Sequence, residues 1–278
     1  MFKADPQDYP HPSFRDGLLF IHHRVWIPND TPHVISLILQ EFHSSRIGGH
    51  AGFLQTYTRI AASFAWQGMR RDVRAWVRAC QVCQRAKHVQ TSPAGLLSPL
   101  PVPNKVWEDI AMDFITGLPA SRGYFVIFVV VDRLSKYAHF APLQTSFTAI
   151  KVAEVFVASV VKLHGFPRSI VSDRDKVFIS SFWQHLFKFH GTSLKMSSAY
   201  HPQTDGQSEA VNKCLEMYLR CFNSEQPHQW VQFLPWAELC YNSSFHTSMG
   251  MTPFKVLYGR DPPSIIPASI NDDTPWVQ

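Results

Sequence analysis

The sequence predicts an α/β protein in which a mixed sheet of five strands is flanked by helices, with a small helical unit ahead of it. Three observations predict this arrangement. From residue 108 onward, apolar runs of strand length and segments of helical period follow in the order three strands, helix, strand, helix, strand, helix. Residues 33–80 show only helical periods, and a proline-rich stretch at residues 91–104 separates the two regions. At 278 residues, the chain is long enough for one full domain and a smaller unit.

The region before the proline-rich stretch divides into an extension and a helical unit. Residues 1–30 carry short apolar alternations between turn residues, which predict a small pair of strands. In residues 31–90, apolar residues recur at helical steps in three segments, which predict short helices over residues 33–43, 51–64 and 69–80. Because three short helices enclose only a small core, a unit of this size needs a further link such as a metal.

Two histidines and two cysteines supply the ligands for such a metal. His43 and His50 have six residues between them, and Cys80 and Cys83 have two. Two imidazoles and two thiolates form a closed tetrahedral set for Zn²⁺, so we predict a structural zinc site. The alternative is that the histidines, two of fourteen, lie at the surface and that the CxxC pair is a redox motif. A redox CxxC normally lies in a thioredoxin-like βαβ unit, whereas this pair ends an arginine-rich helix.

The positive charge of the chain is concentrated in its first third. Through Lys105 there are 12 Lys and Arg residues against 6 Asp and Glu, and the remainder has 14 against 15. Arg70, Arg74 and Arg78 recur every four residues on one side of the third predicted helix. Such a row is either a solvated face or a contact surface for a polyanion. We name these three arginines as candidate DNA-binding residues.

The proline-rich residues 91–104 are interpreted as a linker, followed by the main domain over residues 105–262 and a polar tail over residues 263–278. Three strands are predicted first and form a meander. Two helix–strand pairs and a long helix follow, and the last segment is helical with an interruption at Pro235. In chain order the strands are predicted at residues 108–118, 124–132, 137–143, 169–173 and 192–197, and the helices at residues 147–165, 180–191, 208–222 and 229–244.

Three acidic residues of the main domain are candidate metal ligands. Asp113 interrupts an apolar strand, Asp173 ends another, and Glu209 lies in the first turns of the long helix. Functional groups of open α/β sheets gather at strand ends, so these carboxylates can converge. Close carboxylates repel one another, and a divalent cation that prefers oxygen ligands, Mg²⁺ or Mn²⁺, reverses that repulsion. Two such ions support in-line displacement at a phosphodiester, which fits a nucleic-acid substrate.

Other charged residues near these three have competing interpretations. Lys213 lies four residues after Glu209, where it either holds a DNA phosphate or forms an ordinary ion pair with that glutamate. Asp132 ends the second predicted strand, and Asp175 follows Asp173 by two residues. Each of these two aspartates is a weaker candidate ligand.

Composition argues against membrane and disulfide-rich classes of protein. The longest uninterrupted apolar run, residues 124–131, has eight residues, whereas about 20 are needed to cross a bilayer as a helix. We therefore expect no membrane partner. The five cysteines are an odd number, and no basic segment followed by an apolar one opens the chain, so an intracellular protein is expected.

Four further segments give the sequence a resemblance to a known family. MDFITGLP and VDRLSKYAHF span the first three predicted strands, SIVSDRD contains Asp173, and AYHPQTDGQSE leads to Glu209. Together with the spacing of the two histidines and two cysteines, they resemble the integrases of gypsy-class LTR retrotransposons, which are related to retroviral integrases. The resemblance covers roughly residues 15–262. The 35 residues between Asp173 and Glu209 are typical of the catalytic residues of that family.

The resemblance implies a ribonuclease H-like core in which Asp113, Asp173 and Glu209 bind the catalytic Mg²⁺ or Mn²⁺. It implies a polynucleotidyl transferase that cuts the ends of element DNA with water and then joins the freed 3′-hydroxyl to target DNA. Double-stranded DNA would be the partner, the protein would form a homo-oligomer, and the nucleus is the expected location.

The resemblance also assigns a role to the polar stretch that begins at Tyr200. This stretch would be the mobile active-site loop of the family, in which Gly206 gives freedom and Thr204 or Asp205 caps the following helix. Its polar residues, Gln207 among them, would face DNA.

Members of this family usually continue into a small β-barrel domain, sometimes with a chromodomain, and the sequence up to Gln278 resembles neither. We therefore expect that the C-terminal domain is missing, and we keep two alternatives to an active transferase. One is an impaired or domesticated integrase fragment that acts as a zinc-dependent DNA-binding or self-association module. The other is a simple metal-dependent nuclease of the same fold, which the preceding zinc unit disfavours.

Overall fold

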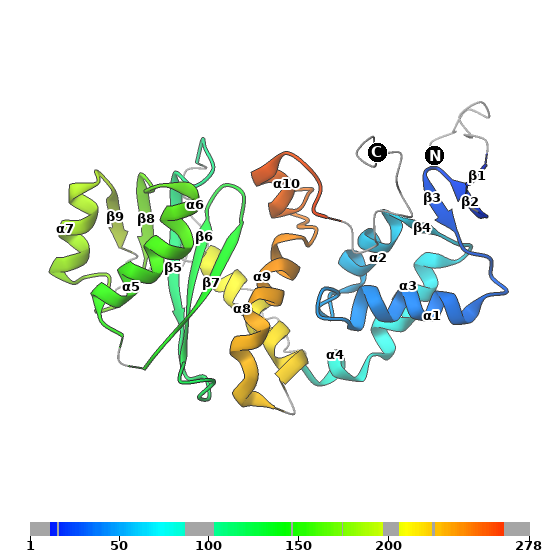
Figure 1. The fold of residues 1–278 in the computed structure, drawn as a ribbon, viewed down its shortest axis with the longest axis horizontal. Coiled ribbons are helices and arrows are strands. Elements are labelled where there is room, and N and C mark those ends of the chain that lie inside the picture. Colours follow the sequence, from blue (N-terminus) through cyan, green and yellow to red (C-terminus); the bar gives the residue numbers. More distant parts are fainter. Residues whose placement is uncertain are drawn as a thin grey trace, which may run out of the picture. The chain divides into compact units, whose positions relative to one another are not determined.

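The structure is a computed structural model, and it describes residues 12–15, 17–86, 103–145, 147–173, 175–196, 206–223 and 226–263. The chain divides into two compact units, Met1–Lys87 and His88–Gln278, and each is described by itself (Figure 1). The predicted linker lies mostly outside the described ranges. Within them, no helix has both the length and the apolar character needed to cross a membrane.

The helices of the first unit carry apolar residues on one face and charged residues on the other. In α3 the residues Val73 and Val77 are buried, while the four arginines of the helix, at positions 70, 71, 74 and 78, are exposed. Ile60 and Trp66 are among the other buried residues of this small core. The helices are α1 (Pro32–Leu39), which continues into a π-helical turn at Gln40–Ser44, α2 (Phe53–Ala61), α3 (Met69–Ala79) and α4 (Gln81–Ala86).

A small sheet joins the N-terminal extension to these helices. Its strands are β1 (Ser13–Arg15), β2 (Leu18–Ile21), β3 (Arg24–Trp26) and β4 (Phe64–Ala65), in that order. The first three form an antiparallel meander, and β3 pairs with β4 in parallel, with Val25 opposite Phe64. The helix predicted over residues 51–64 therefore ends early, at Ala61, because the carbonyls of Ser63 and Ala65 accept bonds from the N–H groups of Val25 and Ile27 in the extension.

The second unit is built on a mixed sheet of five strands in the order β7-β6-β5-β8-β9. The first three strands along the chain pair antiparallel, whereas β5 pairs with β8 and β8 with β9 in parallel. This confirms the predicted mixed five-stranded sheet. The strands are β5 (Asp109–Ile115), β6 (Val126–Asp132), β7 (Ala138–Leu143), β8 (Ser169–Ser172) and β9 (Ser193–Met196).

Helices cover both faces of this sheet (Figure 1). Side-chain hydroxyls of Thr148 and Ser180 accept bonds from backbone N–H groups in the first turns of α5 and α7, as helix caps do. One run comprises α5 (Ala149–Phe156), a π-helical turn (Val157–Val161) and α6 (Lys162–His164), and α7 (Ser181–Phe189) follows β8. The later helices are α8 (Gly206–Asn223), a 3₁₀ segment (Pro227–Phe233), α9 (Leu234–Asn242) and α10 (Pro253–Tyr258).

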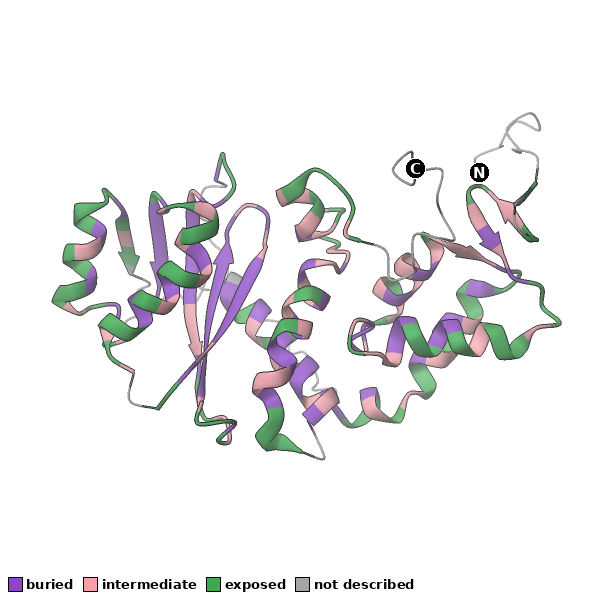
Figure 2. Ribbon diagram, in the orientation of Figure 1, coloured by how far each residue is buried: buried purple, intermediate pink, exposed green. Residues whose placement is uncertain are grey.

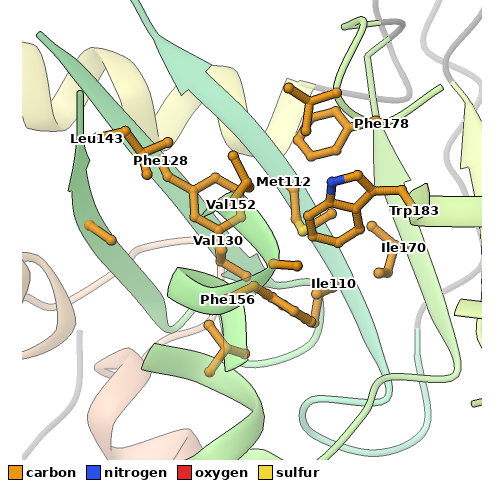
Figure 3. Close-up of a cluster of buried hydrophobic side chains, with 14 of the residues drawn as sticks. Ile110, Met112, Phe128, Val130, Leu143, Val152, Phe156, Ile170, Phe178 and Trp183 are labelled. Carbon is orange, nitrogen blue, oxygen red and sulfur yellow. The ribbon is translucent and has the colours of Figure 1, made fainter. Parts of the chain in front are cut away.

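Side chains point alternately to the two faces along each strand, so the apolar residues of the sheet fall into two cores. Ile110 and Met112 of β5 pack with Phe128 and Val130 of β6 beneath α5 and α7 (Figure 3). Their neighbours in sequence face the other way: Ile127, Val129 and Val131 pack against α8 and α9. Because β6 is buried on both faces, it reads as a continuous apolar run (Figure 2).

The outer edge of β7 is closed by side chains of α9. Asn242 accepts a bond from the Ala138 N–H at 2.9 Å and donates to the Ala138 carbonyl at 2.8 Å. One turn earlier, Glu238 accepts from the Phe140 N–H at 2.9 Å. The next outward position is Pro142, which has no N–H to offer. These contacts satisfy the backbone groups with which an exposed edge strand would bind another chain.

We expect Asn242→Ala to destabilise the second unit. Asn242 and Ala138 are both buried, so the substitution leaves a backbone donor and acceptor unsatisfied, each costing about 1–3 kcal/mol. Urea unfolding of the zinc-loaded chain should show the core free energy of unfolding reduced by roughly 2–4 kcal/mol. The control is Ser243→Ala on the same helix, where a change below about 0.5 kcal/mol is expected. Equal losses in the two variants would contradict the edge-closing role.

Candidate metal sites

Four side chains of the first unit bring their ligand atoms together. His43 lies in the π-helical turn after α1, His50 precedes α2, Cys80 follows α3, and Cys83 lies in α4. One ligand atom of each residue lies within 4.8 Å of the other three. Cys80 Sγ is 3.4 Å from His50 Nδ1, and Cys83 Sγ is 3.4 Å from His43 Nε2. Cys83 Sγ also lies 3.7 Å from His50 Nδ1.

These separations fit a tetrahedral zinc ion. With Zn–N near 2.0–2.1 Å and Zn–S near 2.3 Å, adjacent nitrogen and sulfur ligands lie about 3.6 Å apart. Burial lowers the pKa of His50, which favours the neutral imidazole that binds metal. Nδ1 of His43 faces the Thr56 hydroxyl at 3.5 Å, and that hydroxyl donates to the Ala51 carbonyl at 3.2 Å. Thr56 therefore helps to orient the His43 ring, with Nε2 left for the metal.

The backbone between the two histidines folds back on itself. The His50 N–H donates to the His43 carbonyl at 2.8 Å, and the Gly49 N–H donates to the Ser45 carbonyl at 2.9 Å. To make this return, Gly49 and His50 adopt φ values of 66° and 49°. Glycine takes this left-handed conformation freely, whereas for histidine it costs roughly 1–2 kcal/mol.

Gly48 and Arg59 fix the shape of this turn. A Cβ on Gly48 would lie 2.8 Å from backbone atoms of Phe42 and His43, closer than such atoms can approach. From α2, Arg59 Nη1 donates to the carbonyls of Ile47 and Gly48 at 2.8 and 3.2 Å. The turn that carries both histidines is thus packed tightly on one side and bonded to a helix on the other.

The carboxylates of the second unit are placed by two parallel strands. Met112 of β5 pairs with Ser172 of β8, so Asp113 and Asp173 are the next residues along the two strands. By the alternation of β5, Asp113 lies on the side of the sheet that α8 covers, where Asn212 Nδ2 donates to its Oδ2 at 2.7 Å. Asp173 therefore lies at the carboxyl end of β8, the usual place for functional groups in such sheets, and Asp113 lies beside it within β5, directly after the last residue that pairs with β8.

Electrostatic effects connect the three predicted acidic residues. Burial raises the pKa of Asp113, and the negative charges of Asp173 and Glu209 raise it further, against bonds donated by the Phe114 N–H and by Asn212. Burial also raises the pKa of Asp173, and the charge of Asp175 adds to this. Negative charges that repel one another in this way make the cluster a suitable environment for a divalent cation.

Glu209 is turned toward Lys213. Its Oε1 lies 2.6 Å from Lys213 Nζ, and more than half of each side chain is exposed. Within the described part of the chain, the His/Cys group alone brings three or more potential ligand atoms together. The three carboxylates therefore do not meet in one ligand sphere here, and the ion pair predicted as the ordinary role of Lys213 is present.

Asn212 is the residue of this site that the sequence did not single out as functional. It lies three residues after Glu209 on the same helix, and it bonds directly to Asp113. Its other amide atom, Oδ1, is buried without a hydrogen-bond partner among the described residues. The only signal in the sequence is its place on the polar stripe of α8, which solvated residues share.

The two aspartates that were weaker candidate ligands accept hydrogen bonds that stabilise turns. Asp132 is fully buried and accepts bonds from the N–H groups of Trp107 and Ser135 at 2.9 and 2.8 Å, which organises the turn between β6 and β7. Asp175 accepts from the Val177 N–H at 2.8 Å. These bonds explain why an acidic residue occurs at each position without a metal.

The predicted DNA-binding residues lie in three places. Arg70, Arg74 and Arg78 are exposed along one face of α3. Lys213 lies on α8, one turn beyond Glu209. The side chain of Gln207 is outside the described residues, as are the predicted helix caps Thr204 and Asp205.

Two known families match successive parts of the chain. Residues 30–89 match the family described as the integrase zinc binding domain, and residues 101–202 match the integrase core domain. The chain belongs to the integrase family. Polyproteins of the transposons Tf2-3 and Tf2-4 of Schizosaccharomyces pombe are 36% identical to it over 249 residues, which is 89% of this chain. These relatives confirm the resemblance to retrotransposon integrases. The chain spans only 19% of their length.

Solved structures show the same fold. A chain of the simian T-cell lymphotropic virus intasome in complex with PP2A regulatory subunit B56 gamma has a TM-score of 0.50 and 17% identity, with 80% of this chain and 77% of that chain covered. The HTLV-2 integrase catalytic core domain in complex with magnesium gives 0.45 and 17%, with 56% and 98% covered. The similarity to the intasome chain, together with the match to the integrase core domain, shows the ribonuclease H-like fold that the resemblance implied for the core.

We expect Gly48→Ala to weaken zinc binding by about 10–100-fold, the effect typical of losing support around a metal ligand. The added methyl meets backbone rather than a flexible side chain, so the turn must open and displace His43. Release of zinc to a chromogenic chelator measures the change. The control is Gly52→Ala, because a Cβ there meets nothing within 4 Å. Equal zinc release from the two variants would contradict this account of the turn.

Removal of zinc should unfold the first unit and leave the second folded. The small core of the first unit depends on the metal, whereas the second has its own two large cores. Hydrogen exchange after chelation should show protection lost in α1, α2 and α3 and kept in β6. Loss of protection in β6 at the same chelator concentration would show that the two units do not unfold separately.

Proposed function

We propose that this integrase is a polynucleotidyl transferase that processes the 3′ ends of retrotransposon DNA and joins them to target DNA. The observation that supports it most is the placement of Asp113 and Asp173 directly after the last paired residues of two parallel strands, with the charge of Glu209 acting on the same site. Three carboxylates that repel one another and come from three different elements are suited to hold Mg²⁺ or Mn²⁺. Two such ions would activate the attacking hydroxyl and stabilise the leaving oxygen in an in-line displacement.

The side chains of this site would bind the metal, orient one of its ligands and bind DNA. Asp113 and Asp173 would supply fixed ligands from the sheet, and Glu209 would supply a third from α8. Asn212 would hold the Asp113 carboxylate in one orientation through its bond to Oδ2. Lys213 would bind a DNA phosphate once Glu209 turns to the metal, with Gln207 facing the DNA beside it.

The ion pair between Glu209 and Lys213 is a small obstacle to this arrangement. An exposed pair at this helical spacing contributes about 0.2–0.5 kcal/mol. A divalent cation beside two carboxylates interacts far more strongly than that, so a rotation of the Glu209 side chain is favoured when the ion binds.

Double-stranded DNA is the proposed partner, both as element ends and as target, and a homo-oligomer would hold two ends together. Arg70, Arg74 and Arg78 would contact DNA from the first unit. Action on chromosomal DNA would place the protein in the nucleus.

The alternative is a zinc-dependent DNA-binding or self-association module without joining activity. The observation that favours it is the same ion pair, because Glu209 is directed away from a shared ligand sphere with the aspartates. A simple nuclease of the same fold has no observation in its favour, since the zinc unit adds a second binding surface that such an enzyme does not need.

The test compares Glu209→Gln with Glu216→Gln in the joining of a labelled DNA duplex to a plasmid with Mg²⁺ or Mn²⁺. Both glutamates lie on α8 and form ion pairs four residues onward, to Lys213 and Arg220. We expect the first variant to lose at least about two orders of magnitude in product, because a metal ligand contributes several kcal/mol, and the second to match the unmodified chain. Product that is unaffected by Glu209→Gln would remove Glu209 from the site. Absence of product from the unmodified, zinc-loaded chain would favour the binding module.

A further inference from the structure

An open groove of about 780 Å³ runs along α3 in the first unit. Three of the arginines that line it, Arg70, Arg74 and Arg78, come from successive turns of that helix, and Arg71 lies beside them. The fifth is Arg24, on β3 of the N-terminal extension. The parallel pairing of β3 with β4 brings Arg24 to the groove, and no pattern in the sequence connects this residue with the others.

The groove carries positive charge that the described part of the protein does not neutralise. Five arginines line it and no carboxylate does. Arg71 is paired with Asp72 at 3.1 Å, whereas Arg24, Arg70, Arg74 and Arg78 have no acidic partner among the described residues. A solvated helix face normally mixes the two signs of charge, so four unpaired arginines in one concave surface indicate an anionic ligand.

Aromatic rings beneath the groove hold two of these arginines in place. The guanidinium of Arg74 lies 4.7 Å from the ring centre of Phe53, and that of Arg70 lies 5.8 and 6.0 Å from Phe53 and Tyr57. Such contacts orient the planar donors before a ligand arrives, which lowers the entropy lost on binding. Because the rings already contact arginines, they are not free to stack on unpaired bases.

Trp66 is also unavailable to a base. It is buried, and its Nε1 donates to Asp72 at 3.0 Å. The groove therefore offers charged donors and no stacking surface. Its chemistry suits phosphate groups along a backbone rather than base edges.

We propose that this groove binds the phosphodiester backbone of duplex DNA without reading its sequence, and that Arg24 is one of the binding residues. Successive turns set Arg70, Arg74 and Arg78 about 6 Å apart along the helix axis, so the row spans about 12 Å, or three to four phosphates of one strand. The choice of DNA as the polyanion rests on the proposed function. Binding here requires neither Asp113, Asp173, Glu209 nor their metal.

The test measures the salt dependence of DNA binding by the full, zinc-loaded chain. Fluorescence anisotropy of a short labelled duplex is recorded over a series of salt concentrations without added Mg²⁺ or Mn²⁺. The variants are Arg24→Gln, the double variant Arg24→Gln/Arg74→Gln, Arg24→Lys, and the control Arg85→Gln. Arg85 is exposed on α4 of the same unit, outside the groove, and bonds only locally to Gln81. Zinc content of each variant confirms that the unit is folded.

Each lost phosphate contact lowers the slope of log affinity against log salt by about 0.9. We expect this reduction for Arg24→Gln and about twice as much for the double variant, with Arg85→Gln unchanged. Arg24→Lys should keep the slope, since the charge and not the guanidinium shape sets it. Duplexes of unrelated sequence should bind alike.

Unchanged slopes in both glutamine variants would overturn the proposal, and so would a strong preference for one duplex sequence. If joining depends on Glu209 but the slopes are unchanged, the proposal for the groove fails and the transferase proposal stands. If the slopes change as expected but no joining occurs, the proposal for the groove stands and the transferase proposal fails.

Discussion

The parallel pairing of β5 with β8 is the constraint on which the second unit depends. It sets Asp113 and Asp173 at the same level of the sheet, and the register that pairs Met112 with Ser172 leaves no freedom in that placement. A shift of one residue would turn Asp113 from the side of α8 into the core beneath α5, where a charge has no partner. The apolar alternation of β5 thus protects the site: Ile110 and Met112 fit one core and Ile115 the other, so only one register buries them all.

The zinc site shows how a small unit tolerates unfavourable local structure. His50 adopts a left-handed backbone at a cost of roughly 1–2 kcal/mol, and Gly48 packs against backbone with no room for a methyl. A structural zinc ion contributes about 10–16 kcal/mol in small zinc-binding peptides, so it outweighs such strain several-fold. The strained turn also brings the ring centres of His43 and His50 to 5.1 Å from each other.

Residue patterns predicted the parts of this structure that depend on local chemistry. The mixed sheet was predicted because periods of two and 3.6 residues are properties of single elements, and the His/Cys pairs because ligand types and spacing are local too. The parallel pairing of Val25 with Phe64 was not predicted, since β4 has only two residues and leaves no periodic signal. For the same reason Arg24 and Asn212 were not singled out: each acquires its role from a contact with a distant element, and neither lies in a recognisable motif.

The second unit gathers negative charge at its candidate site and the first unit gathers positive charge, so each is suited to a partner of the opposite charge. In the second unit, burial raises the pKa values of Asp113 and Asp173, which disfavours their ionised forms. Protons therefore compete with a metal for these oxygens at low pH, and metal affinity should grow with pH until both aspartates are ionised. In the first unit, the exposed arginines present positive charge that suits an anion. DNA with its associated divalent ions would satisfy both requirements: its phosphates would neutralise the arginines, and the ions would neutralise the carboxylates. On this proposal, positive charge is concentrated in the first third of the sequence because the metal would supply the positive charge that the core needs.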